Sequence, residues 1–220
     1  MDMITLEDIR ANEKIQKLIQ HADMTLKQVG YTEHGFRHAG IVAERAGRLL
    51  RELGYDERRA QLAEIAGYLH DIGNVVNRMH HAQHSAHIVL SLLPEMGMDY
   101  SEVLDIAMAV GNHHEGEGDP ISDIGAALIL ADKSDVHYSR VRNPDTVAFD
   151  IHDRVNYAAK DSKLIVADAN TIELSILIDP DISSVMEYFE IFMTRMIESR
   201  RATKFLGKDF QLVINGVRLT

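Results

Sequence analysis

The segment from Ala66 to Leu90, "AGYLHDIGNVVNRMHHAQHSAHIVL", restricts the fold of this chain more than any other feature of its sequence. It places a His-Asp pair and four further histidines among Leu, Ile, Val and Ala residues, which are the types most often buried. Burying ionisable groups without partners costs several kcal/mol each. A fold that packs these apolar residues must therefore also bring partners to the imidazoles and the carboxylate.

Helical spacing of apolar residues runs through most of residues 5–140 and predicts a succession of helices. Gly54 and Gly73 are expected to end two of them, and Pro94 is expected to follow the end of a third. Ser122 is the expected N-cap of the last one. The predicted helices cover residues 38–53, 56–73, 81–93 and 101–113, and a fifth begins near residue 122.

The pattern changes after about residue 145, where short β-branched segments replace the helical spacing. The segments "KLIVAD" and "TIELSILID" predict a β-hairpin, a helix is expected over residues 182–201, and "FQLVINGVRL" predicts one or two further strands with an Asn-Gly turn. The sequence thus predicts a mainly α fold, with a helical domain over residues 1–145 and a small α+β appendage over residues 146–220. The appendage carries no chemical motif, and covering a functional site, dimerisation and ligand sensing all stay open as its role.

The composition argues against thiolate metal sites, binding to long nucleic acids and membrane association. The chain has no cysteine, so any metal must be held by histidines and carboxylates, and a reducing cytoplasm is the expected location. The net charge of −11 and the lack of a Lys/Arg cluster argue against binding to long nucleic acids, although bound cations would still admit a small phosphorylated substrate. No apolar run approaches 18 residues, and the acidic N-terminal segment is unlike a secretory signal, so no membrane association is expected.

The predicted helices carry ionisable side chains on their apolar faces. His38 lies four residues before Val42, and Asp132 lies four residues after Leu128, so each shares a face with buried residues. A single histidine in such a position is usually a hydrogen-bonded core residue. Too few Lys and Arg residues lie near these side chains to pair with all of them. A divalent metal would satisfy all of them at once. The inward-facing set is His38, His70, Asp71, His81, His84, His113, His114 and Asp132.

This arrangement resembles the HD superfamily of metal-dependent phosphohydrolases, whose pattern is a helix-borne His, then His-Asp, then a distant Asp. The pattern maps to His38 in "FRHAG", to His70 and Asp71 in "YLHDIGN", and to Asp132 in "LILADKSD". The resemblance covers about residues 30–142 and implies an HD-domain helical bundle. It also implies a cofactor of one or two divalent metal ions, which could be Mn, Fe, Ni, Co, Zn or Mg.

Additional histidines resemble those of family members that bind two metals. "HHAQHS" and "GNHHEGEG" occupy the places where HD-GYP cyclic-dinucleotide phosphodiesterases and YqeK-type hydrolases carry extra ligands. The chain departs from the first of these groups, because "GEGDPIS" stands where the Gly-Tyr-Pro triplet belongs. In the first segment His81 fits the family frame best and His84 is second, whereas His80 and His87 are expected to be solvated or to lie behind the ligands.

The resemblance implies a role for each ligand. Asp71 would bridge two cations, with His38, His70 and Asp132 completing one site and His81, His113 and His114 completing the other. A water between the metals would lose its proton near neutral pH and attack phosphorus.

Positively charged side chains close to the last ligand would bind the substrate. Lys133, directly after Asp132, would act in catalysis and contact a substrate phosphate, and Arg140 and Arg142 would also bind phosphate unless they form ion pairs with nearby acids. Asp135 would orient a ligand, and Glu115 would do the same or cap a helix end.

The expected function is therefore hydrolysis of a phosphate ester or anhydride, with a nucleotide as the expected substrate. Two alternatives stay open: a di-iron oxygenase of the same fold, and a non-catalytic, metal-stabilised module that binds a nucleotide and signals through residues 146–220. The expected partner is a small phosphorylated substrate, and a homodimer stays open.

Overall fold

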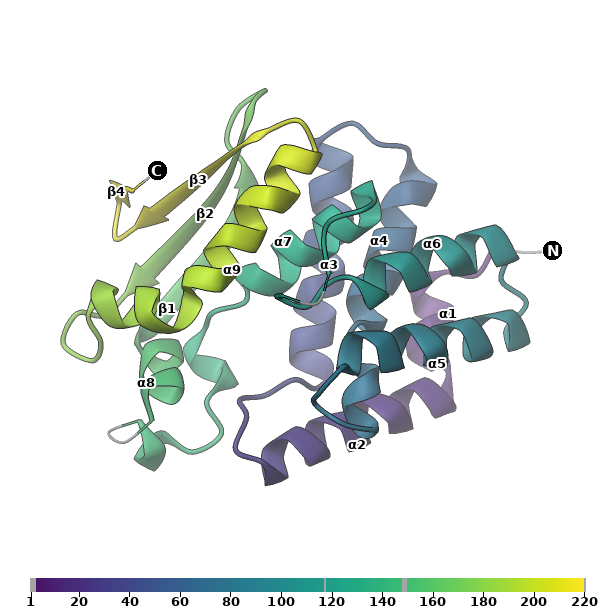
Figure 1. Ribbon diagram of the computed structural model, residues 1–220, viewed down its shortest axis with the longest axis horizontal. Helices are drawn as coiled ribbons and strands as arrows, with labels where there is room; N and C mark the ends of the chain where they lie inside the picture. Colours follow the sequence, from purple (N-terminus) through teal and green to yellow (C-terminus); the bar gives the residue numbers. More distant parts are fainter. Residues whose placement is uncertain (1–2, 117, 148–149, 220) are drawn as a thin grey trace.

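In the computed structural model, which describes residues 3–116, 118–147 and 150–219, a bundle of helices is followed by a small sheet with its own helices (Figure 1). Among the described residues, no helix has both the length and the apolar character needed to cross a bilayer. The helices of the bundle are α1 Leu6–Ala11, α2 Glu13–Gln28, α3 Phe36–Glu52, α4 Glu57–Leu69, α5 His81–Glu95, α6 Tyr100–Gly111 and α7 Asp123–Ser134, with a 3₁₀ helix η1 Ile72–Val75.

Side-chain caps set where most of these helices begin. Asp56 accepts a hydrogen bond from the N–H of Arg59 at the start of α4, and Ser122 accepts one from the N–H of Gly125 at the start of α7. These caps satisfy N–H groups that have no partner inside the helix. The prediction that Ser122 caps the last helix of the bundle is confirmed.

Pro94 does not end α5 where the sequence predicted. The helix includes Pro94 and runs to Glu95, after which the N–H groups of Met96 and Met98 both bond to the carbonyl of Leu93. Proline is costly in a helix because it lacks an N–H and crowds the preceding turn. Here it lies one residue from the helix end, so the loss is confined to the last turn.

Helices α3 and α4 approach closely at Gly67, which has no side chain. A Cβ placed on Gly67 would lie 2.8 Å from the Cα of Ala43 and 2.9 Å from the carbonyl carbon of Val42. Ala46 and Ala63, both fully buried, line the same pair of helices. Small residues thus let the two backbones approach, and this approach sets the separation of His38 on α3 from His70 at the end of α4.

The C-terminal part forms a four-stranded sheet with the strand order β1-β2-β3-β4. β1 and β2 are the predicted hairpin, with Leu164 opposite Leu174. β2 and β3 pair in parallel, with α9 as the crossover between them, and β3 and β4 form a second hairpin through Asn215 and Gly216, which both have positive φ. The elements are η2 Tyr138–Arg140, η3 Pro144–Thr146, α8 Ile151–Ala158, β1 Ala159–Val166, β2 Thr171–Ile178, α9 Val185–Phe205, β3 Asp209–Ile214 and β4 Val217–Arg218.

Helix α9 lies between the sheet and the bundle, packing against β3 on one side and α7 on the other (Figure 1). Tyr188 and Phe192 of α9 belong to a separate apolar core with the sheet. Leu164, Ile172 and Ala202 instead belong to the core of the bundle. The predicted mainly α fold with a small C-terminal α+β part is confirmed, and the two parts share apolar packing.

Candidate metal centre

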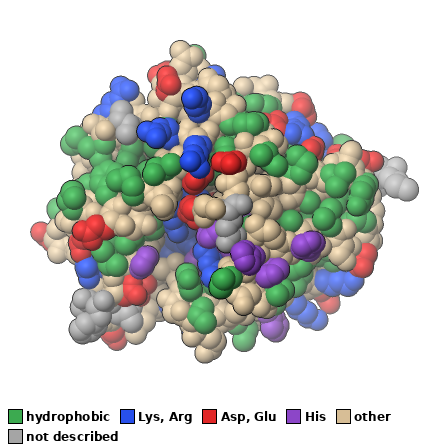
Figure 2. All heavy atoms as spheres, viewed as in Figure 1, with side chains coloured by type: hydrophobic (Ala, Val, Ile, Leu, Met, Phe, Trp, Pro, Cys, Tyr) green, Lys and Arg blue, Asp and Glu red, His purple; other side chains and the backbone are tan. Residues whose placement is uncertain are grey.

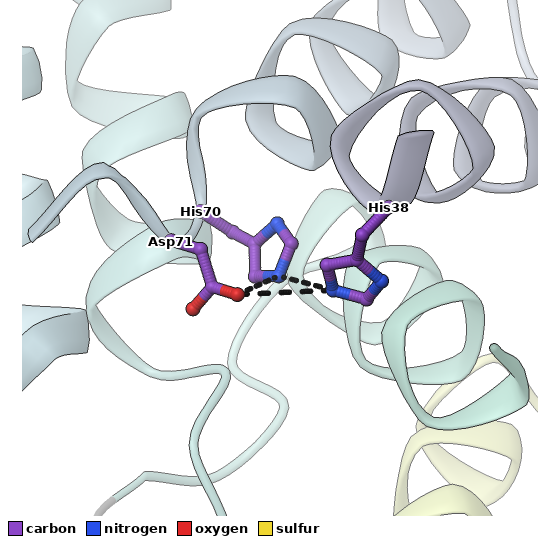
Figure 3. A group of neighbouring side chains, drawn as sticks. All are labelled: His38, His70 and Asp71. Carbon is purple, nitrogen blue, oxygen red and sulfur yellow. Dashed lines mark hydrogen bonds and ion pairs between the residues drawn. The ribbon is translucent and has the colours of Figure 1, made fainter. Parts of the chain in front are cut away.

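Side chains from five segments of the bundle meet at one point. His38 comes from the first turn of α3, the His70-Asp71 pair follows α4, His81 begins α5, His113 follows α6, and Asp132 lies in the last turn of α7. Figure 3 shows the imidazoles of His38 and His70 and the carboxylate of Asp71 pointing toward one another. Donor atoms within 4.8 Å of one another form three overlapping groups: His38, His70 and Asp71; His70, His113 and Asp132; and Asp71, His81 and His113.

The first side of the cluster surrounds the Nε2 atom of His38. This atom lies 3.3 Å from His70 Nε2 and 3.3 Å from Asp132 Oδ1. The Nε2 of His70 lies in turn 3.3 Å from Asp71 Oδ2. All four side chains therefore direct a nitrogen or oxygen atom at one small volume.

The second side of the cluster uses the other oxygen of the same aspartate. Asp71 Oδ1 lies 3.3 Å from His81 Nε2, which is 3.2 Å from His113 Nε2. The ring centroids of His70 and His113 are 4.9 Å apart, so the two sides adjoin. Because its two carboxylate oxygens face different histidines, Asp71 has the position required of a bridging ligand.

The opposite ring nitrogen of each histidine is fixed by a protein acceptor. His38 Nδ1 lies 2.7 Å from Asp135 Oδ2, and the Nδ1 atoms of the other three lie 2.7–3.0 Å from backbone carbonyls. Carboxylate and carbonyl oxygens cannot donate, so each Nδ1 carries a proton, and in the neutral ring Nε2 is left with a lone pair. The carbonyl partners are Gly67 for His70, Arg78 for His81 and Val110 for His113.

A divalent cation fits this set of donors. Four unprotonated Nε2 atoms and two carboxylates bring lone pairs and negative charge together in a buried place, which is unfavourable without positive charge. Neutral imidazole and carboxylate are the ligands that Mn, Fe, Ni, Co and Zn accept. The histidine Nδ1–H groups already have the outer partners that metal-bound histidines require.

Burial and charge keep two of the histidines neutral and both carboxylates ionised, as metal ligands require. Burial lowers the pKa of His81 to about 4 and that of His113 well below its ordinary value, so both are neutral at neutral pH. Burial would raise the pKa of Asp71 and Asp132, but neighbouring charges, His70 for Asp71 and Lys133 for Asp132, hold both well below their usual value. For His70, burial opposes the effect of Asp71, and the pKa is raised overall.

Asp135 is the residue that holds His38 in place. Besides the contact with His38, its carboxylate accepts hydrogen bonds from both Nη atoms of Arg37, at 3.3 and 2.8 Å. Burial would raise its pKa, but Arg140 and His38 lower it. The sequence predicted that Asp135 orients a ligand, and its position matches that role.

Lys133 lies between two acids beside the cluster. Its buried Nζ is 2.6 Å from Asp132 Oδ2 and 3.2 Å from Glu115 Oε1, and Glu115 Oε1 lies 3.5 Å from Arg195 Nε of α9. Burial would lower the pKa of Lys133, but Asp132 and Glu115 raise it overall, so the amine is charged. These contacts link the last ligand of the bundle to the C-terminal helix.

The remaining predicted site residues lie further from the donor groups. The His114 ring is 4.6 Å from that of His81, and its Nδ1 is 3.3 Å from Glu115 Oε2, at the more exposed edge of the site. Arg140 donates to the carbonyls of Glu33 and Asp135, and Arg142 donates to the carboxylate of Asp23. The two arginines thus have protein partners. Among the nearby histidines, His81 rather than His84 faces Asp71.

Three neighbours of the cluster were not identified from the sequence. Asn74 Nδ2 donates to the carbonyl and to Oδ1 of Asp71, both at 2.9 Å. His34 is buried, with its ring centroid 5.3 Å from that of His38. Arg78 Nη1 lies 3.4 Å from His81 Nε2. Two of these neighbours could have been found from helical spacing, because Asn74 lies three residues after Asp71 and His34 lies four residues before His38. Arg78 lies in a turn, where residue spacing does not indicate which side chains come close.

Comparison with known proteins places the cluster inside a matched segment. Residues 35–153 match the family model described as HD domain. An uncharacterized protein of Methanocaldococcus jannaschii is 25% identical over 195 residues, which are 78% of this chain and 75% of that protein. A predicted HD superfamily hydrolase from an uncultured Thermotogales bacterium is 27% identical, with a TM-score of 0.45, over 60% of this chain and 74% of its own.

Ribonuclease Y proteins match a shorter segment. That of Lawsonia intracellularis is 33% identical over 108 residues, or 49% of this chain and 19% of the relative. That of Bacillus subtilis is 31% identical over 105 residues, or 48% of this chain and 18% of the relative. The chain thus spans less than a fifth of these enzymes, against three quarters of the archaeal relative.

Proposed function

Because this chain belongs to the HD-domain family, whose model matches more than half of it, we propose that it is a phosphohydrolase that cleaves a nucleotide. The family match and the buried His/Asp cluster support a metal-dependent hydrolase. The bond that we assign to it is a phosphate ester or anhydride. The observation that carries this proposal is the convergence of four Nε2 lone pairs on the carboxylates of Asp71 and Asp132.

The donor groups would divide between two cations, with Asp71 contributing to both sites. His38, His70 and Asp132 would hold one of them, and His81 and His113 would hold the other, with His114 at the open edge as a further candidate. When bound, such cations supply an activated water and neutralise phosphoryl oxygens. The protein itself fixes the imidazoles through their Nδ1–H groups and orients Asp71 through Asn74.

One observation supports a phosphate ester as the bond that is cleaved, and a second favours a small substrate. Ribonuclease Y, which matches about half of this chain, is by its name an enzyme that acts on RNA, and this supports a phosphate ester as the bond that is cleaved. The net charge of −11 opposes the binding of a long polyanion, because counterion release requires clustered Lys and Arg residues. A mononucleotide needs only a few cationic groups.

The proposal is tested by metal analysis together with a phosphate-release screen. The purified protein, with each of Mn, Fe, Ni, Co, Zn and Mg added back, would be assayed on nucleotides and on p-nitrophenyl phosphate. Asp71→Asn removes the charge of the shared carboxylate, so we expect loss of bound metal and a fall in turnover of at least about 1,000-fold. His87→Ala, at an exposed position of α5, is the matched control and should keep its bound metal and its turnover.

Two results would count against the proposal. Full metal content with normal turnover in Asp71→Asn would remove the bridging role. A metal-loaded wild-type protein that releases phosphate from none of the esters would remove the assigned reaction.

A further inference from the structure

A cavity of about 420 Å³ lies beside the metal centre and is walled in part by the C-terminal helices. Figure 2 shows a hollow near the middle of this face, with Lys or Arg, Asp or Glu and His side chains in it. The segment 29–32 and His34 form one wall, and residues of α8 and α9 form the other. Arg78 and Glu115, which neighbour the cluster, also line the cavity.

Two arginines from different parts of the chain enter this cavity. Arg78 lies with its guanidinium carbon 5.1 Å from the ring centroid of Tyr31, and Nη1 is 4.0 Å from Asp71 Oδ1. Arg195 lies over the ring of Phe192 at 4.4 Å, and its Nε is 3.5 Å from Glu115 Oε1. The side chains are 25% and 24% exposed, so both reach solvent while an aromatic ring positions each.

We propose that Arg78 and Arg195 bind the anionic phosphate of a nucleotide-sized substrate in this cavity, which makes α9 part of the active site. This inference rests on the proposed function. A guanidinium offers two parallel N–H groups that match the oxygens of a phosphate, and the contacts of Arg78 to Asp71 and of Arg195 to Glu115 are long, at 4.0 and 3.5 Å. A phosphate held by both arginines lies at the edge of the metal centre, where its ester bond would be cleaved.

The rest of the cavity suits the organic part of such a substrate. Val29, Ile191 and Phe192 supply apolar surface for a flat ring, and Thr32 supplies a polar group. Asn156 also lines the cavity; it is 4% exposed, and its Oδ1 has no hydrogen-bond partner among the described residues. A ligand with an N–H group, as on a nucleobase, would supply the missing donor.

The size of the cavity separates a mononucleotide from a longer chain. Sites for small molecules usually measure ~300–1,000 Å³, and this cavity is near the lower limit. A single nucleotide fits such a volume, whereas an RNA strand would have to extend over the acidic surface outside it.

Arg195 provides the sharper test because it does not contact the ligand set. In Arg195→Met, the KM for a nucleoside monophosphate should rise roughly 10- to 100-fold, as expected for the loss of one charge-assisted hydrogen bond, with kcat within about twofold. Arg195→Lys, which keeps the charge but not the paired N–H groups, should give an intermediate KM. Arg200→Met, at an exposed position of the same helix, is the control and should leave KM unchanged.

Calorimetry with inorganic phosphate keeps the inference separate from the proposed reaction. The metal-loaded wild type should bind phosphate, and Arg195→Met should bind it roughly 10-fold or more weakly at unchanged metal content. If no ester is hydrolysed, the proposed function fails, but this titration still decides the role of Arg195. Equal KM and equal phosphate affinity in wild type and Arg195→Met would overturn the inference, as would cleavage of an RNA oligonucleotide that Arg195→Met leaves unaffected.

Discussion

At the scale of single residues, hydrogen bonds at the Nδ1 atoms hold the histidine rings of the cluster in position. Each Nδ1 is bonded to an acceptor outside the cluster, so the rings cannot turn without breaking a hydrogen bond. Three of these acceptors are backbone carbonyls, which substitution cannot remove. Asp135, behind His38, is the exception and is therefore the point where this support can be tested.

Replacing Asp135 by Asn should weaken metal binding without removing a ligand. An amide has lower negative charge, so His38 loses a strong acceptor, and Arg37 and Arg140 lose their shared counter-ion. We expect the dissociation constant of the metal to rise roughly 10- to 100-fold, the usual effect of changing an outer partner of a ligand. Competition with a coloured chelator measures it.

Asp105→Asn is the matched control, because Asp105 also pairs with an arginine, Arg59, but lies on α6 away from the cluster. Arg59 keeps Asp123 as a partner in this variant. An equal loss of metal affinity in both variants would show that Asp135 acts through general stability.

The ligand candidates were predictable from the sequence because helical spacing fixes which face a side chain occupies. His38 lies four residues from the buried Val42, and this spacing is enough to turn it inward. Arg78 and Arg195 were not predictable, since one lies in a turn and the other is brought close by packing between distant elements. Arg140 was predicted to contact substrate, but sequence could not reveal the carbonyl of Glu33 as its partner.

At the scale of helices, the distance between α3 and α4 depends on Gly67. A methyl group there would meet backbone atoms, which cannot move aside as a flexible side chain would. The helices themselves carry His38 and His70, whose Nε2 atoms are 3.3 Å apart. Helix packing therefore controls the geometry of the cluster from within the core.

Gly67→Ala should separate the two helices. Overpacking of this kind costs roughly 1–3 kcal/mol of unfolding free energy, and we also expect weaker metal binding. Thermal unfolding with and without metal measures both effects. Gly40→Ala on α3 is the control: nothing lies within 4 Å of its added Cβ, so the higher helix propensity of Ala should stabilise the protein by about 0.5–1 kcal/mol. A stable Gly67→Ala variant with normal metal affinity would contradict this account.

The existence of the longer elements was predictable, but some boundaries and pairings were not. α8 was missed because residues 151–158 form a helix of only eight residues, which is too short for helical spacing to stand out. The helix predicted to reach His113 ends at Gly111, and the helix expected to run to Gly73 ends at Leu69 before η1. The parallel pairing of β2 and β3 depends on α9 crossing over, which hairpin signals do not encode.

At the scale of the whole molecule, stability of the metal-free protein should depend on pH through its buried histidines. The pKa of His81 is lowered by burial to about 4 in the folded state, against roughly 6.5 when unfolded. Between these values the unfolded chain binds a proton that the folded chain does not, so unfolding free energy falls as pH falls. Burial also lowers the pKa of His34 and His113, which act in the same direction, and the raised pKa of His70 acts against them.

Denaturant unfolding of the chelator-treated protein at pH 7.5, 6 and 5 measures this dependence. Each such histidine contributes a slope of up to about 1.4 kcal/mol per pH unit inside its window. His81→Gln cannot titrate and should show a smaller slope than wild type. Stability that increases toward pH 5 would contradict the assignment of neutral, buried imidazoles.

The placement of Leu164, Ile172 and Ala202 in the core of the bundle has a consequence for protein engineering. A chimera joined near residue 145, with the C-terminal part taken from another protein, would expose the surface of α7 that α9 covers. Matching residues on α7 would have to be exchanged together with the new segment. The C-terminal part and the helix that supplies Asp132 are therefore expected to coevolve, because their packed surfaces must stay complementary.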